Sequence, residues 1–316
     1  MIPRDWIEQA AVRIAPHVRV TPVTYDERRN IYFKWENCQV TGSFKVRGAF
    51  NKILSLRPWE RSKGLVTASA GNHGQGVALA GMFAHTQVAV FVSEHAVPAK
   101  VDAMRALAAQ IRMVVGGYAD AEKAAIKFAG ENYAIWVSPY NDPQVVAGQG
   151  TIGLELASQI PLSREMTVVV PVGGGGLISG IGSALADLPV RPKLVAVQSR
   201  ASRFMHELYR RGSQEGVVDL PSLADGLSGA VEDKSVTIQF VRELVDDVLL
   251  VTEEEIAQAI AFAWREYEQQ IEGSAAVALA AVLNGTIKRP AVVIMTGGNI
   301  QASVHADLVA RYGTNP

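Results

Sequence analysis

A lysine at the start of a predicted helix is the first of four places where the residue types could do chemistry. Lys45 follows the turn-forming stretch TGSF at 41–44 and precedes a helical pattern. The positive end of a helix lowers the pKa of a lysine and favours its free amine, which suits a nucleophilic or Schiff-base lysine. On this feature alone, an ordinary solvated lysine remains the better interpretation.

A run of glycines is the second feature and the strongest. It lies between an apolar strand pattern and a helical pattern, and consists of Gly173, Gly174, Gly175 and Gly176, with Leu177 next. Ordering consecutive glycines costs conformational entropy, and close approach of the backbone to a phosphate is a use that offsets this cost.

This glycine loop does not match a nucleotide-binding fingerprint. A dinucleotide site needs G-x-G-x-x-G, but Ser179 stands at the third glycine position. The next predicted strand ends at Gln198, with no carboxylate for a ribose. A P-loop needs a lysine after the glycines, and none is present. The loop therefore predicts a site for a single phosphate ester.

The third feature is a stretch of small residues between a strand and a helix: Ser69, Ala70, Gly71 and Asn72. Small residues expose the backbone N–H groups at a helix start, where anions bind, and a substrate carboxylate is one candidate. The alternative is a plain turn in which Ser69 or Asn72 caps the helix.

The fourth feature is Thr296, directly after the last apolar strand pattern. A hydroxyl at the carboxyl end of a strand points into the crevice where ligands bind in open α/β sheets. The alternative is a terminal turn that Thr296 caps.

Strand and helix patterns alternate along the chain, which predicts an α/β fold with parallel sheets covered by helices. The predicted strands are Ile31–Trp35, Leu65–Ala68, Val88–Val92, Ile111–Val115, Ala134–Val137, Thr167–Val172, Leu194–Val197, Val248–Val251 and Ala291–Met295. Predicted helices include Gln75–Phe83, Asp120–Gly130 and Glu253–Gln269, the last with Thr252 and Glu255 as a capping box. Arg211–Glu232 is the most loop-like region and predicts either a connecting arm or a mobile lid.

The composition limits the partners to expect. The chain has 30 basic and 31 acidic residues and a net charge of −1, which gives no reason to expect nucleic acid or an anionic membrane. The single cysteine, Cys38, excludes an intramolecular disulfide and indicates a cytoplasmic protein.

The sequence shows no sign of a membrane span or of a signal peptide. The longest apolar run, at 275–283, is too short to cross a bilayer, and the N-terminus does not have the pattern of a signal peptide. The scattered histidines form no zinc motif.

Together the four features resemble the fold type II pyridoxal 5'-phosphate (PLP) enzymes, the tryptophan-synthase-β-like group, and are nearest to threonine/serine dehydratases and serine racemases. The matching stretches are SFK at 43–45, SAGNH at 69–73, AGQGT at 147–151, GGGG at 173–176, ADG at 224–226 and TGGN at 296–299. They span essentially the whole chain.

The resemblance implies two open parallel-sheet α/β domains with PLP in the cleft between them. The large domain would comprise residues 1–50 and 144–316, and the small domain, residues 51–143, would be inserted in it. The resemblance also implies a homodimer, and a chain without the C-terminal regulatory domain of biosynthetic threonine dehydratases.

The resemblance implies a role for each predicted site residue by its position. Lys45 would carry PLP through its amine, and Phe44 would pack beneath the ring. The backbone amides of Gly173 to Leu177 would bind the phosphate. Asn72 would hydrogen-bond the pyridoxal 3'-oxygen, and Thr296 would pair with the pyridine nitrogen, where relatives often carry serine or cysteine.

The implied activity is that of a PLP-dependent dehydratase, or ammonia-lyase. An L-3-hydroxy amino acid, with threonine or serine expected first, would bind the stretch 69–72 through its carboxylate. It would lose its α-proton to Lys45 and then its β-hydroxyl, giving a 2-oxo acid and ammonia. A neutral hydroxyl at Thr296 makes the ring a weaker electron sink than an aspartate would, which favours prompt loss of the β-substituent.

Three departures from the family pattern bear on this activity. Ala70 replaces the serine that serves the opposite face of the substrate in the racemases, so we expect elimination rather than racemisation. Gln198 and Phe204 replace carboxylates that bind a divalent ion in many relatives, so we expect no metal there. Gly273 follows Glu272 where proline is usual, and the sequence does not reveal the consequence.

Several alternatives stay open. Within PLP chemistry they are a serine or hydroxyaspartate racemase and a β-replacement synthase of the same fold. Two alternatives involve no PLP chemistry. One is a nucleotide-binding oxidoreductase, which the mismatch between the glycine loop and the dinucleotide-binding motif makes less favoured. The other is a protein that binds PLP without activity. Bound PLP is yellow, so the colour of the purified protein tests the oxidoreductase, and turnover of threonine tests the inactive binder.

Overall fold

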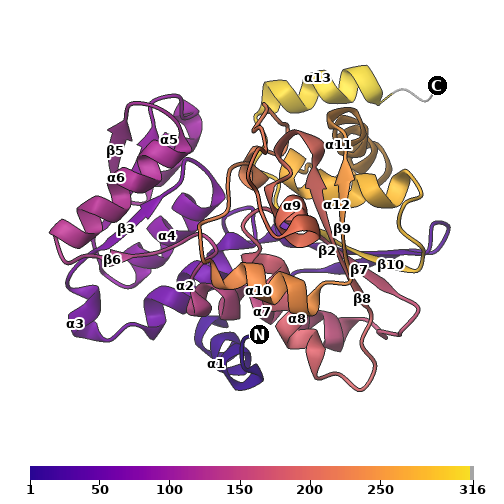
Figure 1. The fold of residues 1–316 in the computed structure, drawn as a ribbon, viewed down its shortest axis with the longest axis horizontal. Helices are drawn as coiled ribbons and strands as arrows, with labels where there is room; N and C mark the ends of the chain where they lie inside the picture. The colour runs from indigo at the N-terminus through magenta and orange to yellow at the C-terminus, as the bar shows by residue number, and fades with distance from the viewer. Residues whose placement is uncertain (314–316) are drawn as a thin grey trace.

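Two sheets, one in each of two α/β domains, organise the computed structural model, which describes residues 1–313 (Figure 1). The larger sheet has the strand order β1-β2-β10-β7-β8-β9, and the smaller has the order β5-β4-β3-β6. The strands are β1 Val23–Asp26, β2 Ile31–Trp35, β3 Leu65–Ala68, β4 Val88–Ser93, β5 Gln110–Val114, β6 Ile135–Trp136, β7 Thr167–Pro171, β8 Lys193–Ser199, β9 Asp247–Val251 and β10 Ala291–Met295.

Helices connect nearly all of these strands. They are α1 Arg4–Ile14, α2 Lys45–Ser55, α3 Pro58–Arg61, α4 Asn72–Phe83, α5 Pro98–Ala106, α6 Tyr118–Glu131, α7 Pro143–Gln159, α8 Gly176–Ala186, α9 Phe204–Arg211, α10 Val236–Leu244, α11 Glu253–Tyr267, α12 Gly273–Leu283 and α13 Ala302–Tyr312. Short 3-10 turns form η1 Glu36–Cys38, η2 Arg200–Ser202 and η3 Asp225–Leu227. Among residues 1–313, no helix has the length and apolarity needed to cross a bilayer.

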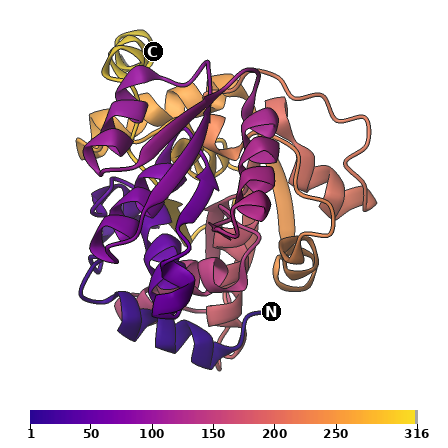
Figure 2. The same cartoon turned by 90° about the vertical axis from the view of Figure 1, so that its left-hand side faces the viewer.

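The larger sheet is the middle of three layers (Figures 1 and 2). Helices α11 and α12 pack on one face, where they form a core with apolar side chains of β2, β8 and β10. Helices α7 and α8 pack on the other face, with a second core. The central strand β7 is buried at every position, as expected for a parallel strand covered on both faces.

The smaller sheet lies beside the larger one and is also covered on both faces. Helix α4 packs with α2 and α5 on one side. On the other side, α6 presents the small residues Ala121, Ala125 and Ala129, which recur every four residues and form one helix face against Val66 and Phe91. Figure 2 views the molecule from the side of this smaller sheet.

Nearly all of the predicted elements are confirmed. The bounds of β2, β3 and β10 agree with the sequence prediction, and the other predicted strands differ by at most two residues at an end. The capping box of Thr252 and Glu255 is present at the start of α11. That helix ends at Tyr267, two residues earlier than predicted, because Glu268 takes a left-handed conformation with φ of 53°.

The edge of the larger sheet differs from the prediction. Strand β1 pairs antiparallel with β2, so this sheet is not wholly parallel. Its residues Val23–Asp26 are only partly buried or exposed, which gives the stretch no apolar run of the kind that marks the other strands.

The loop-like region behaves as a connecting arm. Leu220 N donates to the carbonyl O of Ala201 at 2.9 Å, and Glu232 N donates to the hydroxyl of Tyr140 at 2.8 Å. The arm is therefore fastened to the rest of the molecule near its middle, at Leu220, and at its end, at Glu232, which supports the arm interpretation over a mobile lid.

Candidate active site

Three of the loops that carry predicted residues lie at the two points where the strand order reverses. In the larger sheet the chain runs from β7 outward to β9 and then returns to β10, on the other side of β7. In the smaller sheet it runs from β3 outward to β5 and returns to β6, on the other side of β3. Loops that leave the carboxyl ends of such neighbouring strands diverge and open a crevice for ligands. Thr296 and the glycine loop follow β10 and β7, and the stretch 69–72 follows β3.

Lys45 is the first residue of α2, and its amine reaches the loop after β6. Nζ donates a hydrogen bond to the carbonyl O of Pro139, 3.0 Å away. Burial lowers the pKa of Lys45 to about 8, and the Glu272 carboxylate opposes part of this shift. The lowered pKa agrees with the prediction, but its main cause is burial and not the helix start. A lysine with this pKa keeps a useful fraction of free amine near neutral pH.

A buried ion network holds the first turn of α2 in place. The guanidinium of Arg47, 1% exposed, pairs with Glu36 at 2.8 Å and with Glu155 at 2.6 Å. Lys34 also pairs with Glu155. Because both carboxylates come from other elements, this network fixes where α2 begins and therefore where Lys45 lies.

Phe44 and Thr296 meet in one corner of the crevice. Phe44 N donates to the carbonyl O of Thr296 at 3.1 Å, and Ser43 forms an isolated bridge with Gly297. The Nζ atom of Lys45 lies 5.3 Å from the centroid of the Phe44 ring. The structure thus brings these three predicted residues together from opposite ends of the chain.

The glycine loop turns from β7 into α8 with no room for side chains. Gly175, the N-cap of α8, has φ of +86°, a conformation that glycine adopts without strain. A Cβ on Gly174 would lie 2.3 Å from the Tyr140 ring, and one on Gly173 would lie 3.0 Å from Leu227. The close contacts with Tyr140 and Leu227 alone therefore require glycine at these two positions, whether or not a ligand also approaches the loop. The first N–H groups of α8 have no intrahelical acceptor and form an anion cradle.

The stretch 69–72 opens toward free space at Gly71. A Cβ on Gly71 would meet no atom within 4 Å. Gly71 is the N-cap of α4, and no side chain caps the helix, so the alternative in which Ser69 or Asn72 caps it is wrong. Instead, Ser69 Oγ accepts a hydrogen bond from Gly71 N at 3.1 Å. The first N–H groups of α4 are therefore left without a side-chain acceptor and are available to an anion.

A chain of hydrogen bonds fixes the amide of Asn72. Its Nδ2 donates to Oε1 of Glu272 at 2.7 Å, and its Oδ1 accepts from Nδ2 of Asn299 at 2.7 Å. Asn299 also donates to the carbonyl O of Thr41 at 2.9 Å. Asn72 is thereby tied to the turn after β10, to the start of α12 and to the turn before α2.

The sequence patterns do not point to three residues of this site: Pro139, Tyr140 and Glu272. Burial and the nearby Asp225 raise the pKa of Glu272 to about 7, against the opposing charge of Lys100. An acidic residue directly before a helix that is apolar apart from Ser274 is the signal that could have identified Glu272. Nothing in the sequence marks Tyr140, because its position at a reversal point depends on the strand order.

The departures from the family pattern have local explanations. Gln198 Oε1 accepts from the backbone N of His206 at 3.1 Å, and Phe204 packs into the apolar core. Within residues 1–313, no cluster of three or more histidine, cysteine or acidic side chains is placed to hold a metal ion; the expected lack of a metal at Gln198 stays a prediction. At Gly273, a Cβ would lie 2.0 Å from the carbonyl O of Leu223, so the arm packs where a proline ring would otherwise stand.

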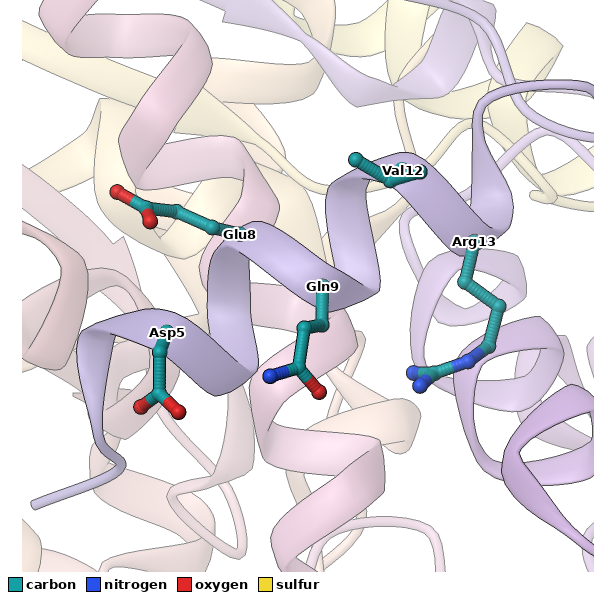
Figure 3. Close-up of a pocket in the computed structure, with 5 residues that line it drawn as sticks. All are labelled: Asp5, Glu8, Gln9, Val12 and Arg13. Carbon is teal, nitrogen blue, oxygen red and sulfur yellow. The ribbon is translucent and has the colours of Figure 1, made fainter.

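A surface pocket of about 580 Å³ contains none of the predicted residues (Figure 3). Its lining side chains are Asp5, Glu8, Gln9, Val12 and Arg13. All belong to successive turns of α1, so the pocket is a shallow hollow along one helix and not a chemical site.

Comparisons with known proteins agree with this geometry. The family model described as "Pyridoxal-phosphate dependent enzyme" matches residues 10–297. The L-threonine ammonia-lyase of Thermotoga maritima is 42% identical over 276 residues, which cover 87% of this chain and 68% of the relative. The L-threonine ammonia-lyase of Geobacter sulfurreducens is 37% identical over 98% of this chain and 79% of its own. The structure of maize serine racemase superposes with a TM-score of 0.88 at 31% identity, covering 98% of both chains.

Proposed function

We infer the activity from one premise: this chain belongs to the family of pyridoxal-phosphate-dependent enzymes. We propose that it is a dehydratase, or ammonia-lyase, that converts an L-3-hydroxy amino acid to a 2-oxo acid and ammonia. Threonine is the first expected substrate, because relatives that share 37–42% of their residues with this chain are L-threonine ammonia-lyases. Serine is the second.

The residues present fit PLP. Three features surround one crevice: a buried amine at Lys45, an anion cradle too narrow for any Cβ at Gly174, and Thr296, a residue that is 2% exposed. His73 adds a buried ring nitrogen, Nδ1, with no partner among residues 1–313, while its Nε2 lies 3.1 Å from the carbonyl O of Val137. These groups match an aldehyde, a phosphate and a pyridine nitrogen better than they match a nucleotide.

Each predicted residue has a distinct proposed task. Lys45 holds the cofactor covalently, and Phe44 packs beneath its ring. The amides of the loop from Gly173 to Leu177 bind its phosphate. Asn72, with its amide fixed, donates to the 3'-oxygen, and Thr296 pairs with the pyridine nitrogen. Bound PLP supplies the electron sink for the reaction.

The observation that supports elimination is a buried base at Lys45, together with an alanine at position 70, where the resemblance to the racemases leads one to expect a serine. Lys45 Nζ, with a pKa near 8, takes the proton from Cα of the substrate. The amides of 69–72 hold the substrate carboxylate and so orient the Cα–H bond toward that amine. Ala70, on the same stretch, offers only a methyl group.

A serine or hydroxyaspartate racemase is the alternative that the fold itself favours, given the superposition on maize serine racemase. A β-replacement synthase is compatible with the same cofactor site. Neither alternative explains the alanine at position 70 or the names of the relatives as directly as a dehydratase does.

A panel of L-3-hydroxy amino acids tests the proposal. Purified holoenzyme is incubated with L-threonine, L-serine, L-threo-3-hydroxyaspartate and L-threo-phenylserine, and release of ammonia and 2-oxo acid is measured. We expect equal amounts of both products, fastest from threonine or serine. Absence of a 2-oxo acid from the whole panel would remove the dehydratase assignment.

We also propose a homodimer, a cytoplasmic location and the domain bounds 1–50 with 144–316, and 51–143. The bounds place each sheet in one domain, since the smaller sheet occupies residues 65–136. A single cysteine supports the location. The exposed apolar side chains of Trp59, Met82 and Phe83 support self-association. Light scattering behind size-exclusion chromatography measures the oligomeric state.

A further inference from the structure

One ion pair joins the two domains beside the candidate active site. Nζ of Lys100, on α5 of the smaller domain, lies 3.2 Å from Oδ2 of Asp225, on η3 of the larger domain. The lysine side chain is 20% exposed and the aspartate side chain 67%. The pair has no part in the activity proposed above.

The loop that carries Asp225 is fixed against the site. Gly226 N donates to Oγ of Ser274, in the first turn of α12, at 3.1 Å. Leu227 packs on the glycine loop, where a Cβ on Gly173 would lie 3.0 Å from its Cα. Asp225 therefore has a defined position relative to the phosphate cradle on one side and to Glu272, which precedes α12, on the other.

Lys100 also lies at the same edge of the smaller sheet as the stretch 69–72. Helix α5 follows β4, and β4 is the direct neighbour of β3, whose carboxyl end carries the stretch 69–72. Asp225 raises the pKa of Glu272 and Lys100 lowers it, so the charges of the pair reach the carboxyl group that holds Asn72. From these relations we place the pair on the side of the crevice where Glu272 holds Asn72.

We propose that the Lys100–Asp225 pair sets the substrate class: it admits L-3-hydroxy amino acids with neutral side chains and rejects those with a second carboxylate, such as 3-hydroxyaspartate. This inference rests on the proposed function. A partly buried lysine without a partner would be a strong charge-assisted donor to a distal carboxylate. Asp225 accepts the hydrogen bond of this lysine and adds a negative charge near Glu272. A second carboxylate on the substrate would therefore be repelled by Asp225 and would find no unpaired ammonium group at Lys100.

The variant Asp225→Asn tests the inference with little change of shape. Asparagine keeps the Oδ1 acceptor that receives Gly226 N at 2.9 Å, so the loop geometry is retained, and it leaves the charge of Lys100 uncompensated. We expect the ratio of kcat/KM for L-threo-3-hydroxyaspartate to that for L-serine to rise by about 10-fold.

Two further variants separate charge from other effects. In Lys100→Met/Asp225→Asn the cation is gone, and we expect the ratio to return to within about 2-fold of the parent value. Asp219→Asn removes the same charge from an exposed position of the same arm, and we expect no change in the ratio. A rise that persists in the double variant, or that appears in Asp219→Asn, contradicts the proposal.

A binding measurement keeps this inference separate from the proposed function. L-alanine and L-aspartate are the counterparts of serine and 3-hydroxyaspartate without the hydroxyl, so neither can lose one. Their dissociation constants are read from the change in cofactor absorbance of the holoenzyme. A relative gain for L-aspartate of about 10-fold in Asp225→Asn supports the inference even if no hydroxy amino acid is turned over. Equal losses for both ligands would show that the pair only holds the domains together, and would overturn it.

Discussion

Asn72 donates its side-chain amide to Glu272 over 2.7 Å, although the two residues are 200 positions apart in the sequence. Asn72 begins α4 in the smaller domain and Glu272 precedes α12 in the larger one, so this bond spans the crevice. Burial and the charge of Asp225 favour the neutral form of Glu272. The residue proposed to hold the 3'-oxygen of PLP is therefore itself held by a carboxyl group that titrates near neutral pH.

The variant Glu272→Gln should change how stability depends on pH. The pKa of Glu272 is raised from 4.5 to about 7, so the folded chain binds this proton more tightly than the unfolded chain. The stabilisation is complete below pH 4.5 and is lost as the pH rises through 7, a difference on the order of 3 kcal/mol. We expect the free energy of unfolding of Glu272→Gln, relative to the parent, to increase between pH 4.5 and 7 and then level off.

Urea denaturation across this pH range, at one fixed PLP concentration, measures that difference. Glu254→Gln is a matched control, because Glu254 is exposed on α11 and makes the same change of charge. Curves for Glu272→Gln and the parent that run parallel from pH 4.5 to 8 would show that Glu272 ionises normally.

Lys45→Ala should remove the covalent attachment of PLP and leave the chain folded. The lysine is held by a single hydrogen bond to Pro139, whereas the buried network around Arg47 fixes α2 independently. Borohydride reduction of the parent followed by peptide mapping should place the PLP mass on the peptide that contains Lys45. Lys63→Ala, at an exposed lysine, should keep the label. A reduced label on any other lysine of the parent would show that the assignment is wrong.

Gly175→Asp and Gly175→Asn form a pair that isolates charge at the phosphate cradle. Gly175 has φ of +86°, a conformation in which both Asn and Asp are better tolerated than other side chains. The two variants therefore share the strain, the volume and the contacts of the new Cβ with Met205, Thr237 and Val241, and differ by one negative charge at the N-cap of α8. We expect the dissociation constant of PLP to be at least about 10-fold higher for Asp, which corresponds to about 1.4 kcal/mol.

Fluorescence titration of the resolved apoprotein with PLP gives both constants, and thermal unfolding checks that the two variants are equally folded. Equal affinities for PLP in the two variants would mean that the phosphate lies elsewhere.

The elements of this fold were largely predictable from the sequence, because each depends on local patterns. The apolar runs of β2, β3 and β10 and the capping box of α11 are contained within short windows. Strand β1 was not predicted, because a half-exposed edge strand has no continuous apolar run. The glycine loop, Lys45 and the stretch 69–72 were found because each combines a turn signal with a helix start.

The relations between distant segments were not predictable in the same way. The approach of Tyr140 to Gly174 and the bond from Asn72 to Glu272 depend on which strands are neighbours. One sequence without coordinates contains no local signal for that order. The pKa of Lys45 illustrates the limit, since its direction follows from a helix start but its main cause, burial, follows from packing.

The enzyme should eliminate water and not racemise efficiently. Racemisation needs a proton donor on the face of the substrate opposite Lys45, because one base on one face returns the proton to the side it came from. Ala70 has no proton to give at the position where the resemblance to the racemases implies a serine. The Oγ atom of the adjacent Ser69 accepts from Gly71 N at 3.1 Å, which holds that hydroxyl within its own loop.

A positioned acid–base group contributes about 10²–10⁴-fold in rate, so its absence should leave pyruvate as the dominant product from L-serine, with little D-serine. Chiral chromatography and a 2-oxo acid assay on the same incubation measure the two products. Ala70→Ser should raise the rate of D-serine formation, and Ala70→Gly, which changes the same side chain without adding a hydroxyl, should not. If D-serine accumulates faster than pyruvate in the parent, or if Ala70→Ser forms no more D-serine than the parent, then the hydroxyl at position 70 is not what separates the two reactions.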